Sequence, residues 1–240
     1  MIAKILEVPF HGISRKDALN TLLGFLNEPR NHLVVTPNPE AVMLAQRNRD
    51  FMRILQNADL VLPDGIGIVL AAKWRNKPIT NRVTGCDITM DLLRAAEGST
   101  CYILGAAPDV AETARQELMK QNINVAGAHH GYFSQMDEEK ILTEIKTYKP
   151  DILLVGMGMP QQEVWAAAHL HTLPCRITLC IGGTIDIMAG KVRRAPNIVR
   201  LLGFEWLYRL ICEPSRAKRM LDLPRFAWAV INEPKHTFPI

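Results

Sequence analysis

The second half of the chain alternates short apolar segments with helical ones, and this alternation restricts the possible fold more than any other feature. The apolar segments are residues 101–104, 123–126, 152–155 and 177–181. Helical patterns follow the first three of them, and glycine-containing turns follow all four. Strands that alternate with helices in this order form a parallel sheet with helices on both faces. The sequence therefore predicts an α/β fold with a doubly wound, mainly parallel sheet.

The first half of the chain continues this order. Residues 4–8 and 32–36 read as strands, and between them Ser14 is placed to cap a helix that runs to about residue 27. Two prolines exclude a helix from the turn Thr36-Pro37-Asn38-Pro39, and a helix can begin directly after it. The whole chain thus predicts a Rossmann-like sheet. With 240 residues, 48% of them hydrophobic, it can bury one sizeable core and carry a small appendage.

Asp64 follows the apolar run of residues 60–62 and precedes two glycines. In an open parallel sheet the carboxyl ends of the strands form the crevice in which ligands bind, so this carboxylate is well placed for chemistry. Thr36 and Asn38 would lie at the same edge, and such short polar groups suit the hydroxyls of a sugar. Each of the three could instead be an ordinary turn or capping residue.

A helix is expected over residues 68–74, and the segment from Arg82 to Asp87 leads into another helix with Asp87 as its cap. An arginine beside a crevice can bind a diphosphate through its planar, charged fork, although most loop arginines are merely solvated.

Glycines follow several of the predicted strands, as in Gly105, Gly156, Gly158 and Gly182. Glycine lets a backbone come close to a phosphate and point amide groups at it, so a nucleotide is the expected ligand. None of these turns forms the G-x-G-x-x-G or Walker pattern, so the sequence indicates neither NAD nor ATP.

Other patterns are absent from the sequence. There is no D-x-D or H-E-x-x-H, and the five cysteines show no C-x-x-C spacing, so we expect no metal, no cofactor and no disulfide framework. The first residues meet Glu7 too soon to form a signal peptide, and the apolar runs are shorter than the roughly 20 residues that span a bilayer. These features predict a cytoplasmic protein without a transmembrane helix.

The C-terminal part is basic and amphipathic. Residues 191–225 contain nine Lys or Arg and three acids, so this segment has a net charge of +6. The rest of the chain has a net charge of −2, and the two together give the total of +4. Helical patterns cover residues 197–211 and 215–231, with Trp, Leu and Phe between the arginines. Such a segment is typical of proteins that bind a phosphate-bearing ligand, an anionic membrane surface or nucleic acid. The alternative interpretation is an ordinary solvated helical face. Nucleic acid is not expected, because no recognition motif is present.

Several longer motifs resemble one family. They are Arg82-Val83-Thr84-Gly85-Cys86-Asp87, Pro160-Gln161-Gln162-Glu163, Gly182-Gly183-Thr184-Ile185-Asp186, Gly190-Lys191-Val192-Arg193-Arg194-Ala195-Pro196 and Leu202-Gly203-Phe204-Glu205-Trp206-Leu207-Tyr208-Arg209-Leu210. Together they resemble the WecG/TagA/CpsF glycosyltransferases (glycosyltransferase family 26) from about residue 9 to residue 225. The turn 36–40 looks most like the teichoic-acid branch. Gln161 is a departure, because a lysine is common at that position of the family.

The resemblance implies an activity. It implies an inverting transfer of N-acetylmannosamine from UDP-N-acetylmannosamine to N-acetylglucosaminyl-diphospho-undecaprenol, for teichoic-acid linkage-unit synthesis, by a peripheral protein on the inner face of the cell membrane. Two alternatives stay open: transfer of another UDP-sugar, such as N-acetylmannosaminuronic acid or glucose, and a non-catalytic nucleotide-binding module that docks on membranes.

The resemblance also implies roles for residues. Asp64 would be the general base, with Asp186 as a second candidate. Thr36, Asn38, Arg82 and Gln162 would line the substrate pocket. Arg209, Arg216 and Arg219 match arginines that contact a diphosphate. Residues 1–195 would form the catalytic domain, and residues 196–240 would form a helical appendage that contacts the membrane and could promote self-association.

Overall fold

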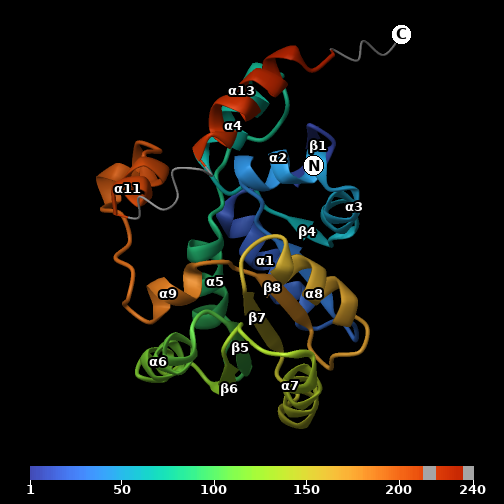
Figure 1. The fold of residues 1–240 in the computed structure, drawn as a ribbon, viewed down its shortest axis with the longest axis vertical. Helices are drawn as coiled ribbons and strands as arrows, with labels where there is room; N and C mark the ends of the chain where they lie inside the picture. Colours follow the sequence, from blue (N-terminus) through green and yellow to red (C-terminus); the bar gives the residue numbers. More distant parts are fainter. Residues whose placement is uncertain (213–219, 235–240) are drawn as a thin grey trace.

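The computed structural model describes residues 1–212 and 220–234. Its centre is a six-stranded sheet with the order β4-β3-β8-β7-β5-β6, in which all neighbouring strands are parallel (Figure 1). The strands are β3 (His32–Val35), β4 (Leu60–Val61), β5 (Cys101–Gly105), β6 (Val125–His129), β7 (Ile152–Gly156) and β8 (Ile177–Cys180). The predicted doubly wound α/β fold is confirmed, although β6 begins later than predicted.

Helices cover both faces of the sheet, because successive strand residues point to opposite faces. Val34, Ile103 and Leu179 pack against one set of helices, and Leu33 and Tyr102 point to the other face. The first face carries α1 (Arg15–Phe25), α5 (Gly85–Ala95), α6 (Pro108–Met119) and α9 (Thr184–Met188). The second face carries α2 (Pro39–Arg47), α3 (Arg49–Asn57), α7 (Gln135–Tyr148) and α8 (Gln161–His169).

The predicted strand over residues 4–8 is wrong. Two strands occupy this region, β1 (Ile2–Ile5) and β2 (Val8–His11), and they form a separate antiparallel hairpin. The two residues between them, Leu6 and Glu7, have φ angles of 46° and 66°. Positive φ at both central residues is the geometry of the tight turn that matches strand twist, and neither residue is of a type that announces such a turn.

Side-chain caps set the starts of several helices. Ser14 accepts a hydrogen bond from the backbone of Asp17 and begins α1, as predicted. The predicted cap of α5 is wrong: the capping residue is Thr84, and Asp87 lies three residues further on. The Thr84 hydroxyl accepts from the Asp87 backbone at 3.2 Å and donates to its carboxylate at 2.6 Å. The Thr84 hydroxyl therefore holds both the backbone and the side chain of Asp87 in the first turn of α5.

The predicted helix over residues 197–211 is interrupted. It consists of α10 (Asn197–Leu201) and α11 (Glu205–Cys212), and Gly203 between them has a φ of 78°. This left-handed conformation ends the first helix and is favourable only for glycine. A Cβ at position 203 would also come within 3.0 Å of Ile66.

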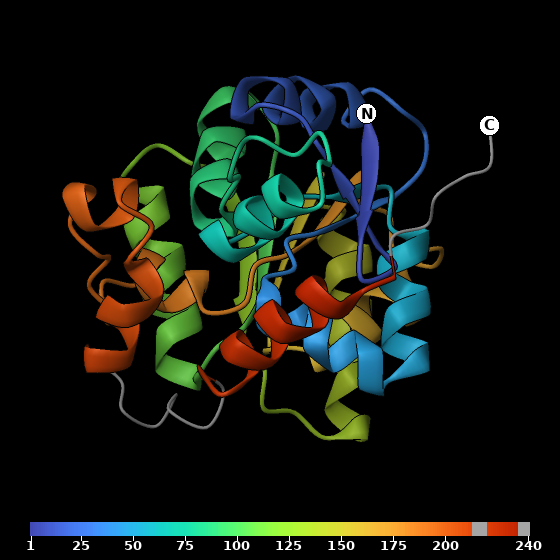
Figure 2. The same ribbon diagram turned by 90° about the horizontal axis from the view of Figure 1, so that it is seen from above.

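The last described helix, α13 (Asp222–Asn232), packs on α2 and on α4 (Ile66–Trp74) (Figures 1 and 2). Phe226 and Val230 are buried in the same apolar cluster as α2 and the hairpin. Residues 215–219 of the second predicted C-terminal helix lie outside the described residues. In the part of the chain that the structure describes, no helix combines the length and apolar character needed to cross a bilayer.

Candidate active site

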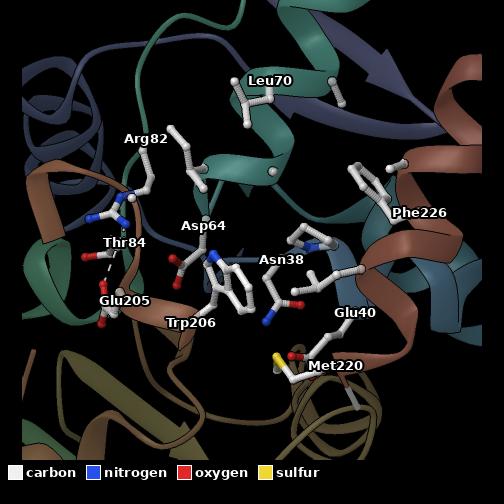
Figure 3. Close-up of a pocket in the computed structure, with 18 of the residues that line it drawn as sticks. Asn38, Glu40, Asp64, Leu70, Arg82, Thr84, Glu205, Trp206, Met220 and Phe226 are labelled. Carbon is white, nitrogen blue, oxygen red and sulfur yellow. Dashed lines mark ion pairs between the residues drawn. The ribbon is translucent and has the colours of Figure 1, made fainter. Parts of the chain in front are cut away.

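The carboxyl ends of β3, β4 and β8 open into a cavity of ≈ 470 Å³ (Figure 3). Its wall is formed by the start of α2, by α4, by the loop after β8 and by residues of α11 and α13. The cavity therefore lies between the sheet edge, where the sequence predicts a ligand, and the C-terminal helices.

Asp64 lies on the cavity wall three residues after the end of β4 and is half-buried. Its Oδ2 atom accepts a hydrogen bond from the backbone N–H of Gly85 at 3.1 Å. Its own backbone N–H donates to the carbonyl of Pro37 at 3.3 Å. These two bonds tie the carboxylate to the start of α5 and to the turn after β3, so its position is fixed by three elements of the sheet edge.

Thr36 and Asn38 lie at the carboxyl end of β3, the predicted edge of the sheet, although β3 ends at Val35 and Thr36 was predicted as its last residue. Asn38 lines the cavity, and its side-chain oxygen accepts from the backbone of Ala41 at 2.9 Å, so it also caps α2. The Thr36 hydroxyl donates to the carbonyl of Cys180 at 3.4 Å. A Cβ at Gly85 would come within 2.8 Å of that hydroxyl, so Thr36 packs closely against Gly85. Gly85 is the residue whose backbone N–H donates to Asp64.

Arg82 reaches the cavity from the segment between α4 and α5. Its Nη1 atom lies 3.6 Å from Oε2 of Glu205, the first residue of α11, and Figure 3 shows this ion pair on one side of Asp64. Both side chains are largely shielded from solvent, with exposures of 18% and 11%. Glu205 was not predicted as a site residue, because its only relation to Arg82 is through the tertiary fold.

Gln162 lies behind the loop that follows β8. Its side-chain oxygen accepts from the backbone N–H of Gly182 at 3.0 Å, and its nitrogen donates to Glu163 at 2.7 Å. Burial raises the pKa of Glu163 to about 7, against the lowering effect of the hydrogen bond from Gln162. The pair fixes the loop that brings Gly183 and Thr184 to the cavity wall. The Gln-Glu pair belongs to the motif of residues 160–163, but no pattern in that motif indicates a buried carboxylate.

The strand-end glycines serve two purposes. A Cβ at Gly105 would come within 2.3 Å of the Gly156 carbonyl, so Gly105 permits close packing of β5 against β7. A Cβ at Gly156 would come within 2.5 Å of Ile185 and 2.6 Å of the Gly182 carbonyl, so Gly156 permits close packing against α9 and the loop after β8. At Gly158 a Cβ would have no neighbour within 4 Å, and at Gly182 it would meet only the Gln162 side chain at 3.9 Å. Only the second pair therefore has the open surroundings that the predicted approach of a phosphate requires.

A cluster of arginines that the sequence did not predict surrounds Asp87. Arg194 lies 2.6 Å from the Asp87 carboxylate, and Arg15 and Arg200 lie 3.6 Å from it. Burial opposes ionisation of Asp87, but the hydrogen bonds from Arg194 and Thr84 lower its pKa to about 2. The carboxylate therefore anchors the segment that leads into α10 to the start of α5.

The remaining predicted residues are placed as follows. Arg209 lies in α11, and Arg216 and Arg219 lie outside the described residues. Asp186 lies in the first turn of α9, and the residues that line the described cavity do not include it. Among the described residues, no group of three His, Cys, Asp or Glu side chains is arranged to hold a metal ion.

Residues 3–238 match the glycosyl transferase WecG/TagA/CpsF family. The chain belongs to this family. Because the match extends from the hairpin to beyond α13, the family's shared sequence includes the C-terminal helices as well as the sheet.

Curated members of the WecG/TagA/CpsF family from Staphylococcus aureus are similar to the chain over most of its length. The protein of strain NCTC 8325 / PS 47 is 32% identical over 209 residues, which cover 86% of this chain and 82% of the relative. The protein of strain MRSA252 is 31% identical over the same shares. Both are named N-acetylglucosaminyldiphosphoundecaprenol N-acetyl-beta-D-mannosaminyltransferase.

Proposed function

We propose that this glycosyltransferase moves N-acetylmannosamine from UDP-N-acetylmannosamine to N-acetylglucosaminyl-diphospho-undecaprenol, with inversion at the anomeric carbon. The observation that carries the proposal is the position of the Asp64 carboxylate on a cavity wall beside Arg82. The names of the staphylococcal relatives support the choice of donor and acceptor.

In this proposal Asp64 is the general base. An inverting transfer needs one carboxylate to take the proton of the acceptor hydroxyl while that oxygen attacks the anomeric carbon. The new C–O bond forms as the bond from the anomeric carbon to the UDP oxygen breaks. The hydrogen bond from Gly85 holds the carboxylate in place, and Asn38 contributes a polar side chain to the same wall.

The departing UDP carries a growing negative charge, which Arg82 stabilises in the proposed mechanism. Gln162 orders the loop after β8, and Thr36 supports Gly85 from behind. Arg209, Arg216 and Arg219 are proposed to contact the diphosphate of the acceptor. This role rests on the family resemblance.

We also propose that the C-terminal segment, residues 196–240, contacts the inner face of the membrane, where the lipid acceptor is located. Large apolar side chains are exposed on the C-terminal helices and beside their ends: Ile198, Leu202, Phe204, Ile211, Leu221 and Trp228. Exposed apolar groups among arginines are typical of helices that lie on anionic membrane surfaces.

The activity is tested by UDP release from UDP-N-acetylmannosamine with the lipid acceptor in vesicles. UDP release should require the acceptor, and the Asp64→Asn variant should lose at least about a hundredfold in rate, because general base catalysis contributes about 10²–10⁴-fold. Asp186→Asn is the matched control and should keep most of the activity.

The same assay separates the alternatives. A panel of UDP-sugars identifies the donor, and a chelator should leave the rate unchanged if arginines supply the positive charge. Binding of UDP without any turnover would favour the non-catalytic module, and wild-type transfer by Asp64→Asn would exclude Asp64 as the base.

A further inference from the structure

The cavity beside Asp64 continues into an apolar groove between α4 and α13. In the view of Figure 3, Phe226 lies on the opposite side of Asp64 from Arg82 and Glu205. We define the groove by six lining residues: Leu70 and Trp74 from α4, Met220, and Leu223, Ala227 and Ile231 from α13. The six groove residues have aliphatic, thioether or aromatic side chains, whereas Asp64, Arg82 and Glu205 contribute charge to the other part of the cavity. Glu40 of α2 also lines the cavity, and Figure 3 shows it on the Met220 side of Asp64.

Helix α4 connects the two parts. It begins at Ile66, two residues after Asp64, and ends at Trp74. With a rise of about 1.5 Å per residue, the far end of the helix lies about 12 Å along its axis from the end near the carboxylate. A hexose joined to a diphosphate covers a similar distance. A molecule whose hydroxyl reaches Asp64 would therefore bring the group beyond its diphosphate to the groove.

The outer end of the groove is exposed to solvent. Leu70, Trp74 and Ile231 line the cavity although 57%, 65% and 56% of each residue is exposed. The inner wall of the groove is part of the packed core, because Phe226 and Val230 of α13 are buried there. An exposed apolar surface that is continuous with a reaction cavity marks a binding groove for an apolar part of a ligand.

We propose that this groove binds the first isoprene units of the acceptor lipid. The inference rests on the proposed function, in which the acceptor carries a hydrocarbon chain beyond its diphosphate. A UDP-sugar has no such group, so the donor does not account for an apolar groove that starts at the catalytic carboxylate. The groove therefore selects a polyprenyl diphosphate sugar over the same sugar diphosphate on a polar carrier.

The test uses water-soluble acceptors without vesicles or detergent, so that attachment to a membrane cannot contribute. The acceptors are N-acetylglucosaminyl diphosphate esters that carry a methyl group or one, two or three isoprene units. KM for the acceptor should fall at least about tenfold from the methyl ester to the three-unit ester, because apolar surface is buried in the groove.

Two variants locate the effect. Ala227→Phe fills the groove with a larger side chain. Leu70→Ser removes apolar surface from the groove at an exposed position, where the substitution leaves no cavity in the core. In both, the ratio of the KM values for the methyl and three-unit esters should fall to about one. Met136→Ser alters a methionine that is 80% exposed on α7, and this variant should keep the wild-type ratio.

The results distinguish this inference from the proposed function. UDP release with equal KM values for all four esters would overturn the groove and leave the transferase activity standing. A wild-type ratio in both groove variants would also overturn it. Absence of UDP release with every ester and with the undecaprenyl acceptor in vesicles would overturn the proposed function and this inference together.

Discussion

Glu205 at the start of α11 lies with its Oε2 atom 3.6 Å from Nη1 of Arg82, at the edge of the cavity that contains Asp64. The pair joins a C-terminal helix to the loop between α4 and α5. Trp206, the next residue of α11, lines the same cavity. Glu205 is therefore placed to orient Arg82 and to hold Trp206 at the cavity.

This relationship predicts that Glu205 and Arg82 act as a unit. We expect Glu205→Gln to lower kcat/KM for UDP-N-acetylmannosamine about tenfold, a change of about 1.4 kcal/mol. Arg82→Gln should lower it at least as much, and the double variant should be no worse than Arg82→Gln, because residues of one ion pair are not additive. Steady-state kinetics of the four proteins measure the coupling. Strictly additive losses would show that the two residues act separately.

A second prediction concerns the attachment of α13 to the α/β core. Phe226 is 4% exposed and packs in the cluster with α2, whereas Trp228, two residues further on, is 70% exposed. Phe226→Ala should lower the free energy of unfolding by about 3–5 kcal/mol, because it leaves a cavity in the core. Trp228→Ala should change it by no more than about 0.5 kcal/mol. Urea denaturation measures the free energy of unfolding of both variants. Equal losses in the two variants would mean that α13 does not pack on the core in solution.

The sheet could be predicted from the sequence because the signal for each strand is local. Val34 and Leu179, for example, lie in short apolar runs bounded by turn residues, and the observed strands agree with these runs. The position of Asp64 could also be predicted, since a polar residue in the turn that follows a strand lies at the carboxyl edge of the sheet.

Other features depend on contacts or backbone angles that the sequence does not reveal. Thr84 and Asp87 are both good capping residues, and only the geometry shows which one begins α5. Gly203 is compatible with a continuous helix until its positive φ is known. The pairing of Arg82 with Glu205 joins segments that are far apart in the chain, so no spacing pattern indicates it.

A third prediction follows from the buried carboxyl group of Glu163. Its pKa is raised from 4.5 to about 7, so the folded protein holds this proton more tightly than the unfolded chain does. Stability therefore falls as the pH rises from about 4.5 to about 7, by an amount on the order of 3 kcal/mol. Glu163→Gln keeps an oxygen for the hydrogen bond from Gln162 and cannot ionise. Relative to the wild type, this variant should become more stable between pH 5 and pH 8.

Urea denaturation at several pH values measures this difference. Glu117→Gln is the control, because the Glu117 side chain of α6 is 41% exposed and pairs with Lys120 at 2.6 Å. The stability of the Glu117→Gln variant relative to the wild type should show no comparable rise with pH. A Glu163→Gln difference that is the same at pH 5 and pH 8 would show that Glu163 is already ionised in the folded protein.

The exposed apolar residues of the C-terminal helices predict binding to anionic vesicles. Ile211 and Trp228 are each 70% exposed, and burial of such side chains in the lipid interface stabilises the bound state by about 1.5–3 kcal/mol each. The double variant Ile211→Ser, Trp228→Ser should therefore bind at least about tenfold more weakly in vesicle flotation. Tyr132 and Met136 are 77% and 80% exposed near the start of α7, so their double serine variant is the matched control. Equal loss of binding in both double variants would assign the attraction to general surface hydrophobicity rather than to the C-terminal helices.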